Sequence, residues 1–282
     1  MVAKNILHDP HVHLLIAMHE HVTESGHRIE VVRKRILDDA GTTQQVEQRS
    51  IGLRLAEAAN ASETIRRLGF VQIDSIRVVS RAHHHILWSR NQNYREPMLG
   101  RHMSEHRRVF EHFTHDASLI PMEFYPYWAR QFRRLEKKVR GWQWHRGMPE
   151  EGGRQAIKAR IEAEGPLSTK AFDTKTGGET AMWSRPPHKL ALDYMWYAGE
   201  LSTAHRENFT KFYDLTERVI PPDLREQDIP DTDQIDWLCR GALDRMAFGT
   251  EGDIQRFWEA VNSEEAKQWT RQYAGELGPV EI

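Results

Sequence analysis

The spacing of apolar and polar residues along the chain predicts a mainly helical protein with a few short strands. In the second half, apolar residues at helical spacing predict helices at Gln155–Ala163, Ser168–Phe172 and Pro187–Ala198. The residues that follow predict a hairpin that pairs Leu201–Ala204 with Phe209–Leu215. Three helices followed by a hairpin is the order of a winged helix, whose third helix usually enters the major groove of DNA.

A second copy of this pattern follows a proline-rich spacer, Ile220–Pro230. Its helices are predicted at Gln234–Phe248, Gly252–Trp258 and Ser263–Ala274. Both copies carry the tetrapeptide Ala-Gly-Glu-Leu, at Ala198–Leu201 and at Ala274–Leu277, where each third helix must stop. We therefore expect an internal repeat, with the sequence ending inside the first wing strand of the second copy.

The first half of the chain is less regular. Helices are predicted at Ile29–Asp39, Gly52–Asn60, Ser62–Leu68, Arg77–Arg90, Ser104–Phe113 and Met122–Val139. We expect Ser62 to be an N-cap and Pro126 to interrupt the last of these helices early. Phe70–Ile76 alternates apolar and polar residues, which predicts a half-buried strand or an extended loop.

Composition fits a polar globular protein, with 39% hydrophobic and 28% charged residues. The 282 residues allow two or three small domains. No stretch approaches the ~20 apolar residues that cross a bilayer, and Met1–Asp9 lacks the pattern of a secretory signal, so we expect a cytoplasmic protein without membrane contact. Cys239 is the only cysteine, which excludes an intrachain disulfide and a thiolate zinc cluster.

Charge is distributed unevenly although the formal net charge is only -2. From Arg77 to Arg146 the chain carries 14 Lys and Arg against 6 Asp and Glu. Such a stretch can follow a phosphate backbone, with affinity that falls as salt rises. The alternative is a solvated helical surface without a nucleic-acid partner.

Two groups of histidines raise the question of a metal site. The leader carries His8, His11, His13, His19 and His21. Their uneven spacing, without an obvious fixed scaffold, favours adventitious metal affinity over a designed site. His83, His84 and His85 are consecutive, and consecutive helical residues point about 100° apart and cannot converge on one ion. We expect neither a metal nor another cofactor.

Gln72 and Asp74 share one face of the alternating segment, while Val71 and Ile73 anchor the other face. With the segments around it, this motif resembles the YcaQ/AlkZ-like crosslink-repair DNA glycosylases, a family of winged-helix proteins. The segments that carry the resemblance are Leu68–Ile76, Arg81–His84, Leu87–Arg90, Ala117–Pro121, Gly165–Leu167, Gly199–Leu201 and Tyr213–Val219. They follow the family order between Gly52 and Ile282, and family members normally continue further, so we expect a C-terminally shortened member.

The resemblance implies a mainly α fold with small β wings, in tandem winged-helix units around a concave, basic DNA-binding surface. It divides the chain into a poorly defined leader (1–50), a first winged-helix-like unit (51–150), a second winged helix (151–222) and a third, truncated in its wing (231–282). It also implies a monomeric enzyme that excises N7-alkylated guanine from double-stranded DNA, including interstrand crosslinks, and that acts at the bacterial nucleoid.

The catalytic tripeptide of the family is matched by Gln72-Ile73-Asp74. Glycosidic cleavage passes through an oxocarbenium-like state. An ionised Asp74 can stabilise that state and accept a proton from a water held by Gln72. No lysine stands in the motif, so we expect a monofunctional glycosylase without lyase activity. The alternative is that Gln72 and Asp74 only cap a neighbouring helix.

Further residues are assigned to the DNA surface. They are Arg77, Arg81, His83, His84, Arg90, His188 and Lys189. On the helix that carries the last two, Asp193 and Tyr194 are also expected to face solvent. His115 fits either the DNA cleft or a structural hydrogen bond. Core packing is favoured over base stacking for Trp183, Trp196, Trp237 and Trp258.

Two other functions stay open. One is a non-catalytic winged-helix DNA-binding regulator, which has no chemical reason to present Gln72-Ile73-Asp74 on a concave surface. The other is a His-ligated metal hydrolase, which the metal content of the purified protein tests.

Overall fold

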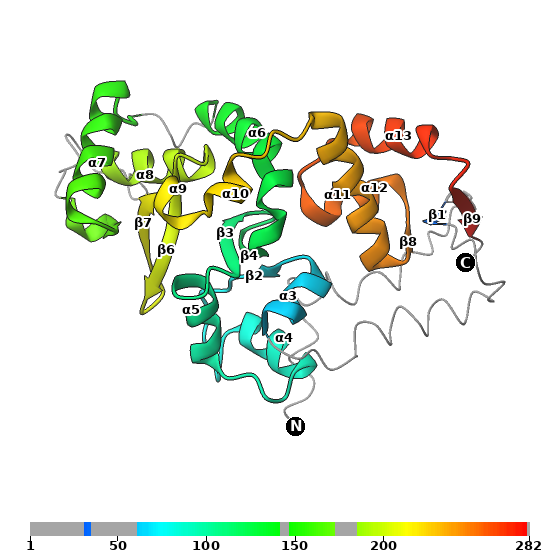
Figure 1. Ribbon diagram of the computed structural model, residues 1–282, viewed down its shortest axis with the longest axis horizontal. Helices are drawn as coiled ribbons and strands as arrows, with labels where there is room; N and C mark the ends of the chain where they lie inside the picture. Colours follow the sequence, from blue (N-terminus) through cyan, green and yellow to red (C-terminus); the bar gives the residue numbers. More distant parts are fainter. Residues whose placement is uncertain (1–30, 35–60, 142–146, 173–184, 281–282) are drawn as a thin grey trace. The chain divides into compact units, whose positions relative to one another are not determined.

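The computed structural model describes residues 31–34, 61–141, 147–172 and 185–280. They form helices and three small antiparallel sheets of three strands each (Figure 1). In these residues no helix is long and apolar enough to span a membrane. The predicted helix Gly52–Asn60, the leader histidines and Trp183 lie outside the described residues.

The segment that holds the Gln-Ile-Asp motif combines three helices with one sheet. Its elements are α3 (Ala61–Leu68), β2 (Val71–Gln72), α4 (Ala82–Arg90), α5 (Glu96–Ser104), β3 (Val109–Phe113) and β4 (Ala117–Pro121). The sheet has the strand order β2-β4-β3. Ile65, Val71, Leu87 and Leu119 are buried in a core shared by helices and sheet, which fixes β2 from behind.

Several predicted boundaries in this region are wrong. Ser104–Phe113 is not a helix: α5 ends at Ser104, Arg107 has φ 48, and residues 109–113 pair with β4. A left-handed residue stops a helix, and the aromatic and β-branched residues after it suit a strand. The helix predicted from Arg77 begins only at Ala82, and Ser62 lies inside α3 rather than capping it.

The segment predicted as one long helix also divides. It consists of a 3₁₀ helix, η3 (Met122–Trp128), followed by α6 (Ala129–Arg140). Pro126 lies inside the 3₁₀ part. A proline lacks the N–H that an α-helix interior requires, so the regular helix starts after it.

The next segment follows the predicted order of three helices and a hairpin. Its elements are α7 (Glu151–Glu164), β5 (Leu167–Ser168), η5 (Thr169–Ala171), α8 (Pro187–Tyr197), β6 (Leu201–Glu207) and β7 (Thr210–Leu215). The predicted hairpin is confirmed, because β6 and β7 pair from Leu201 with Leu215 to Glu207 with Thr210. The sheet order is β5-β7-β6. Two short helices, α9 (Thr216–Val219) and α10 (Pro222–Arg225), lead onward.

The last segment repeats this order of elements. It contains α11 (Asp231–Met246), β8 (Phe248–Gly249), α12 (Glu251–Trp258), α13 (Ser263–Gln272) and β9 (Leu277–Val280). Capping boxes begin α12 at Thr250 and α13 at Asn262, which explains why these boundaries are readable from sequence.

The central strand of its sheet comes from the other end of the chain. The order is β8-β1-β9, where β1 (Val31–Lys34) pairs antiparallel with both neighbours. β1 thus takes the position that β7 takes in the preceding sheet. The helix predicted over Ile29–Asp39 is therefore wrong at residues 31–34, because these residues pair with β9 along their whole length and with β8 at Val32 and Arg33.

A close approach at Gly69 ties the motif segment to α12. Gly69 has φ +93, and a Cβ there would lie 2.6 Å from Cη2 of Trp258 and 2.8 Å from Nε of Arg245. The next residue, Phe70, packs its ring on Phe257 and Trp258. Only glycine combines this backbone conformation with this contact.

Replacing Gly69 with Ala is expected to lower the free energy of unfolding by about 2–3 kcal/mol, because it adds backbone strain to overpacking. Gly100→Ala is the matched control: that glycine lies in α5 with nothing within 4 Å of the added Cβ, so the change should stabilise slightly. Urea unfolding of the three proteins measures both effects. Equal stability of Gly69→Ala and the native protein would contradict the proposed role of the contact.

Candidate active site

The Gln-Ile-Asp motif begins at Gln72, the last residue of β2, and ends at Asp74, two residues beyond the strand. Val71 and Ile73 are buried at 2% and 7% exposure, whereas Gln72 and Asp74 are half-buried. Gln72 lies opposite Ser118 of β4, and the Ile73 N–H donates to the Ala117 carbonyl at 2.7 Å. The pairing therefore continues past Gln72 and holds the motif extended, so that both polar side chains leave the sheet on the same side.

Asp74 is fixed by two hydrogen bonds. Its Oδ1 accepts from the Ile76 N–H at 2.8 Å, and its own backbone N–H donates to Nδ1 of His83 at 3.1 Å. The first bond orients the carboxylate and the second fixes the backbone that carries it. Asp74 is thus held in place by its own chain and by α4.

His83 can accept this hydrogen bond because its ring is neutral. Burial, together with the nearby His84 and Arg81, lowers the pKa of His83 to about 3. With Nδ1 accepting, the ring proton is on Nε2. His83 is only 3% exposed, so its assignment to the DNA surface is wrong. Its position is that of a residue that holds Asp74.

The neighbouring His84 serves a second internal contact. Its Nδ1 lies 2.7 Å from the hydroxyl of Tyr94, and its Nε2 lies 3.7 Å from Glu96. Burial lowers the pKa of His84 although Glu96 opposes the shift. Among the described residues no group of three His, Cys, Asp or Glu side chains is arranged to hold a metal ion.

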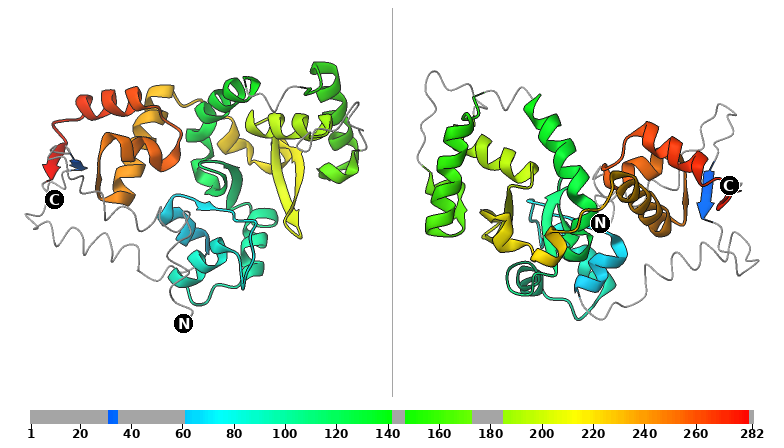
Figure 2. Two further views of the ribbon diagram at one scale, coloured as in Figure 1. Left: turned by 180° about the vertical axis from the view of Figure 1, so that it is seen from behind. Right: turned by 45° about the horizontal axis from the view of Figure 1, so that its top comes forward.

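The tip of the β6–β7 hairpin packs beside this site. The guanidinium groups of Arg81 and Arg206 lie 4.4 Å and 4.7 Å from the ring centre of Phe209, and the His83 ring stacks on Phe209 at 6.5 Å. Strand β6 also lies beside α5 (Figure 2), and Arg107, three residues after that helix, donates to the Ala204 carbonyl of β6 at 2.9 Å. Sequence reasoning missed Phe209, because no local signal shows where a hairpin tip will pack.

A buried carboxylate anchors the same hairpin. Glu111 of β3 accepts two hydrogen bonds of 2.7 Å from Arg206 and lies 3.0 Å from Nζ of Lys211. Burial raises the pKa of Glu111, but Lys211 and Arg206 overcome that effect and lower it to about 2. The Lys211 ammonium lies 3.3 Å from the ring centre of Trp196. These contacts join the hairpin to the sheet that carries the motif.

The three arginines assigned to phosphates differ in setting. Arg77 is exposed in the loop after the motif. Arg81 is half-buried on Phe209, and Arg90 donates to the Ile86 carbonyl at 3.2 Å. Arg77 therefore keeps the most accessible charge of the three.

Part of the basic stretch stabilises the protein internally. Arg130 of α6 is buried, donates to the Ala260 carbonyl at 2.7 Å and pairs with Glu265. Arg133 pairs with Asp231. The number of Lys and Arg residues in this stretch therefore overestimates the positive charge that is free to bind DNA, because some of these side chains are paired with carboxylates.

Of the remaining residues assigned to the DNA surface, some are buried and others are partly exposed. His188 is buried at 6% and stacks on Phe172, so its expected exposure is wrong. Tyr194 is also buried, and its hydroxyl donates to Glu136. Lys189 is half-exposed on α8. His115 contacts the Arg256 carbonyl at 2.6 Å, a structural contact.

The tryptophan prediction is confirmed for two side chains. Trp196 and Trp258 are buried at 3% and 0% exposure. Trp237 is half-buried and stacks on Tyr127 with ring centres 4.5 Å apart.

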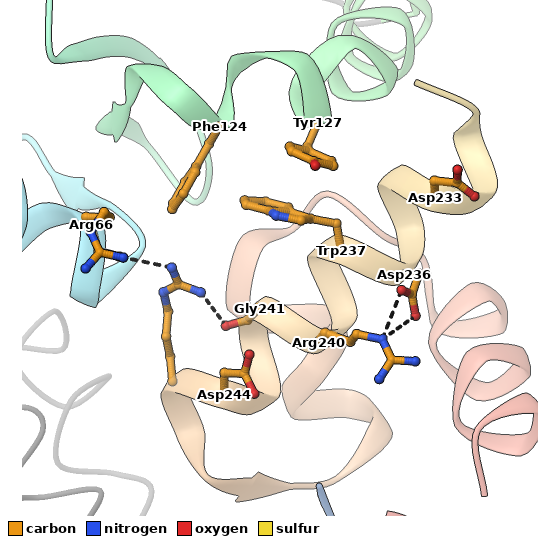
Figure 3. A pocket seen from close by; sticks show the side chains of 10 residues that line it. Arg66, Phe124, Tyr127, Asp233, Asp236, Trp237, Arg240, Gly241 and Asp244 are labelled. Atoms are coloured by element: carbon orange, nitrogen blue, oxygen red, sulfur yellow. Dashed lines mark hydrogen bonds and ion pairs between the residues drawn. The ribbon is translucent and has the colours of Figure 1, made fainter. Parts of the chain in front are cut away.

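A separate hollow lies along α11. It has a volume of about 510 Å³, and Figure 3 shows the Trp237–Tyr127 stack beside charged side chains, of which Asp236 and Arg240 form an ion pair. Asp236 accepts from Arg240 at 2.8 Å, and Arg245 donates to the carbonyls of Gly241 and Arg66. Neither Gln72 nor Asp74 lines it, so the hollow is not the candidate active site.

Fold and motif together define a mainly helical protein with small antiparallel sheets and a half-buried Gln-apolar-Asp face. A family model described as DNA glycosylase AlkZ-like matches residues 65–282, and the chain belongs to this family. The resemblance seen in the sequence is thereby confirmed.

Among solved structures, the chain is similar to Streptomyces sahachiroi DNA glycosylase AlkZ, with a TM-score of 0.56 and 12% identity. The similarity covers 83% of this chain and 65% of that one. At this identity the likeness concerns the fold.

Proposed function

We propose that this protein is a monofunctional DNA glycosylase that excises N7-alkylated guanine and unhooks interstrand crosslinks formed at that atom. The observation that carries the proposal is the setting of Asp74. Its side chain is half-buried, and its Oδ1 accepts a hydrogen bond from the Ile76 N–H, which orients the carboxylate, while its backbone N–H donates to His83 and fixes the chain that carries it. A carboxylate held before substrate arrives stabilises developing positive charge without reorganising.

The reaction follows from the charge of the substrate. Alkylation at N7 makes the guanine cationic, so the bond to C1′ breaks with its electron pair leaving on the base. The sugar passes through an oxocarbenium-like state. Asp74 stabilises this cation and takes one proton from the attacking water, while the amide of Gln72 positions that water. Without a lysine in the motif, no Schiff base forms.

The repeated elements suit a DNA surface. We propose that residues 151–222 and 231–282 are winged helices, with α8 and α13 as their third helices, and that residues 51–150 form the unit that carries the motif. The common order of strands and helices supports this reading. The partner is then double-stranded DNA bound by a monomer, in the compartment that holds the chromosome.

Arg77 is proposed to neutralise one phosphate. Arg77→Ala is expected to weaken duplex binding and to reduce the slope of log affinity against log salt by about one. Arg133→Ala is the matched control, because Arg133 is exposed but already paired with Asp231. Binding isotherms at four salt concentrations measure both variants. A slope that Arg77→Ala leaves unchanged would remove this residue from the DNA surface.

Single-turnover excision of 7-methylguanine from a labelled duplex tests the function. The native protein is expected to release the free base and leave an abasic strand that stays intact until alkali cleaves it. Strand cleavage without alkali would contradict the monofunctional assignment. Binding without excision would favour the non-catalytic regulator, and loss of excision on metal chelation would favour the metal hydrolase.

A further inference from the structure

The loop between β2 and α4 exposes a group of apolar side chains. Ile76, Val78 and Val79 are 68%, 89% and 80% exposed, and Trp88 of α4 is 53% exposed. Among the residues whose side-chain burial the structure describes, the exposed large hydrophobic side chains all lie between Ile76 and Trp88. Such clustering indicates a surface that meets a partner.

The loop is held at both ends. At its start, the Ile76 N–H donates to Asp74, and at its end the Ser80 hydroxyl donates to Glu96. Val71 and Ile73, before the loop, and Leu87, after it, are buried in the same hydrophobic core. The exposed valines therefore stand on a fixed projection that begins two residues after the proposed catalytic carboxylate.

The charge of the projection restricts its partner. Arg77 is exposed between Ile76 and Val78, so a cation accompanies the apolar side chains. A DNA duplex has the complementary arrangement, with phosphates outside and an apolar base stack inside. A loop that bound a lipid surface or a second copy of the protein would have no reason to lie beside Asp74, whereas a loop that binds DNA would.

Resting on the proposed function, we infer that Val78 and Val79 form a wedge that enters the base stack beside the lesion, while Arg77 contacts the adjacent phosphate. Apolar side chains inserted between base steps part them and kink the duplex, which does not require a base tethered by a crosslink to leave the helix. Valine suits this task because its branched side chain has little rotamer freedom to lose. It forms no hydrogen bond to a base, so the wedge does not depend on sequence.

The test uses a duplex with 7-methylguanine and the fluorescent base 2-aminopurine as its neighbour. Stopped-flow fluorescence follows unstacking before excision, and quenched samples follow excision. The variant Val78→Ser/Val79→Ser is compared with Val78→Ile/Val79→Ile, which keeps branched apolar side chains. Both variants are expected to fold normally, because the valines are largely exposed, and thermal unfolding checks this.

We expect native protein and the isoleucine variant to raise the 2-aminopurine signal. The serine variant should lose most of that rise and excise about tenfold more slowly, while its affinity for undamaged duplex changes less than about twofold. An undiminished signal with the serine variant would overturn the wedge, and so would the absence of any rise with native protein.

Failure of the proposed function gives a different result. If native protein unstacks the base through these valines but releases none, the wedge stands and the catalytic assignment falls. Sedimentation at several protein concentrations tests whether the loop instead binds a second copy of the protein. Self-association that the serine changes abolish would show that the loop joins two copies, which overturns the wedge.

Discussion

Replacing Asp74 with Asn is expected to slow single-turnover excision of 7-methylguanine by about a hundredfold or more, because a stabilising carboxylate contributes several kcal/mol to an oxocarbenium-like state. Asparagine keeps the size of the side chain and can still accept a hydrogen bond from the Ile76 N–H. It removes the negative charge and the base. Duplex affinity should stay the same or rise slightly, since a charge that repels phosphates is lost.

Asp116→Asn is a matched control for this change. Asp116 also accepts a hydrogen bond from a nearby backbone N–H, that of Ala117 at 2.7 Å, but it lies in the turn between β3 and β4. Its replacement should leave excision unchanged. Excision kinetics at saturating enzyme, beside binding isotherms on the same lesion duplex, separate chemistry from affinity. If folded Asp74→Asn protein excises at the native rate, another residue is catalytic.

Local signals made much of the fold predictable. Alternation in Val71–Asp74 correctly separated the buried from the half-buried residues of the motif. Capping boxes and glycines marked the helix ends of the two similar segments, and Gly199 has the positive φ of a helix stop. These features depend on neighbours in sequence, which is why they could be read without a structure.

Contacts between distant residues were not predictable in this way. β3 becomes a strand because β4 pairs with it, and β1 because β8 and β9 flank it. His83 was assigned to DNA for its chemistry, whereas the packing of α4 turns it inward to Asp74. For the same reason the sequence did not reveal that Phe209 lies against His83.

The second large effect is expected at Glu111, whose replacement by Ala should lower the free energy of unfolding by about 3–5 kcal/mol. Glu111 is fully buried between Arg206 and Lys211, and truncation leaves both cations without the carboxylate that pairs with them. Urea unfolding measures the loss. Glu200→Ala is the control, because its pair with Lys158 is partly exposed and should contribute below about 1 kcal/mol.

The same carboxylate predicts how stability depends on pH. Its pKa falls from the ordinary 4.5 to about 2 on folding, so its contribution is complete above about pH 4.5 and is lost as the pH falls toward 2. The native protein should lose stability across this interval. Glu111→Gln cannot titrate, so its stability should decline less over the same interval. Parallel pH profiles of the two proteins would mean that Glu111 is not the group whose protonation releases the hairpin from β3.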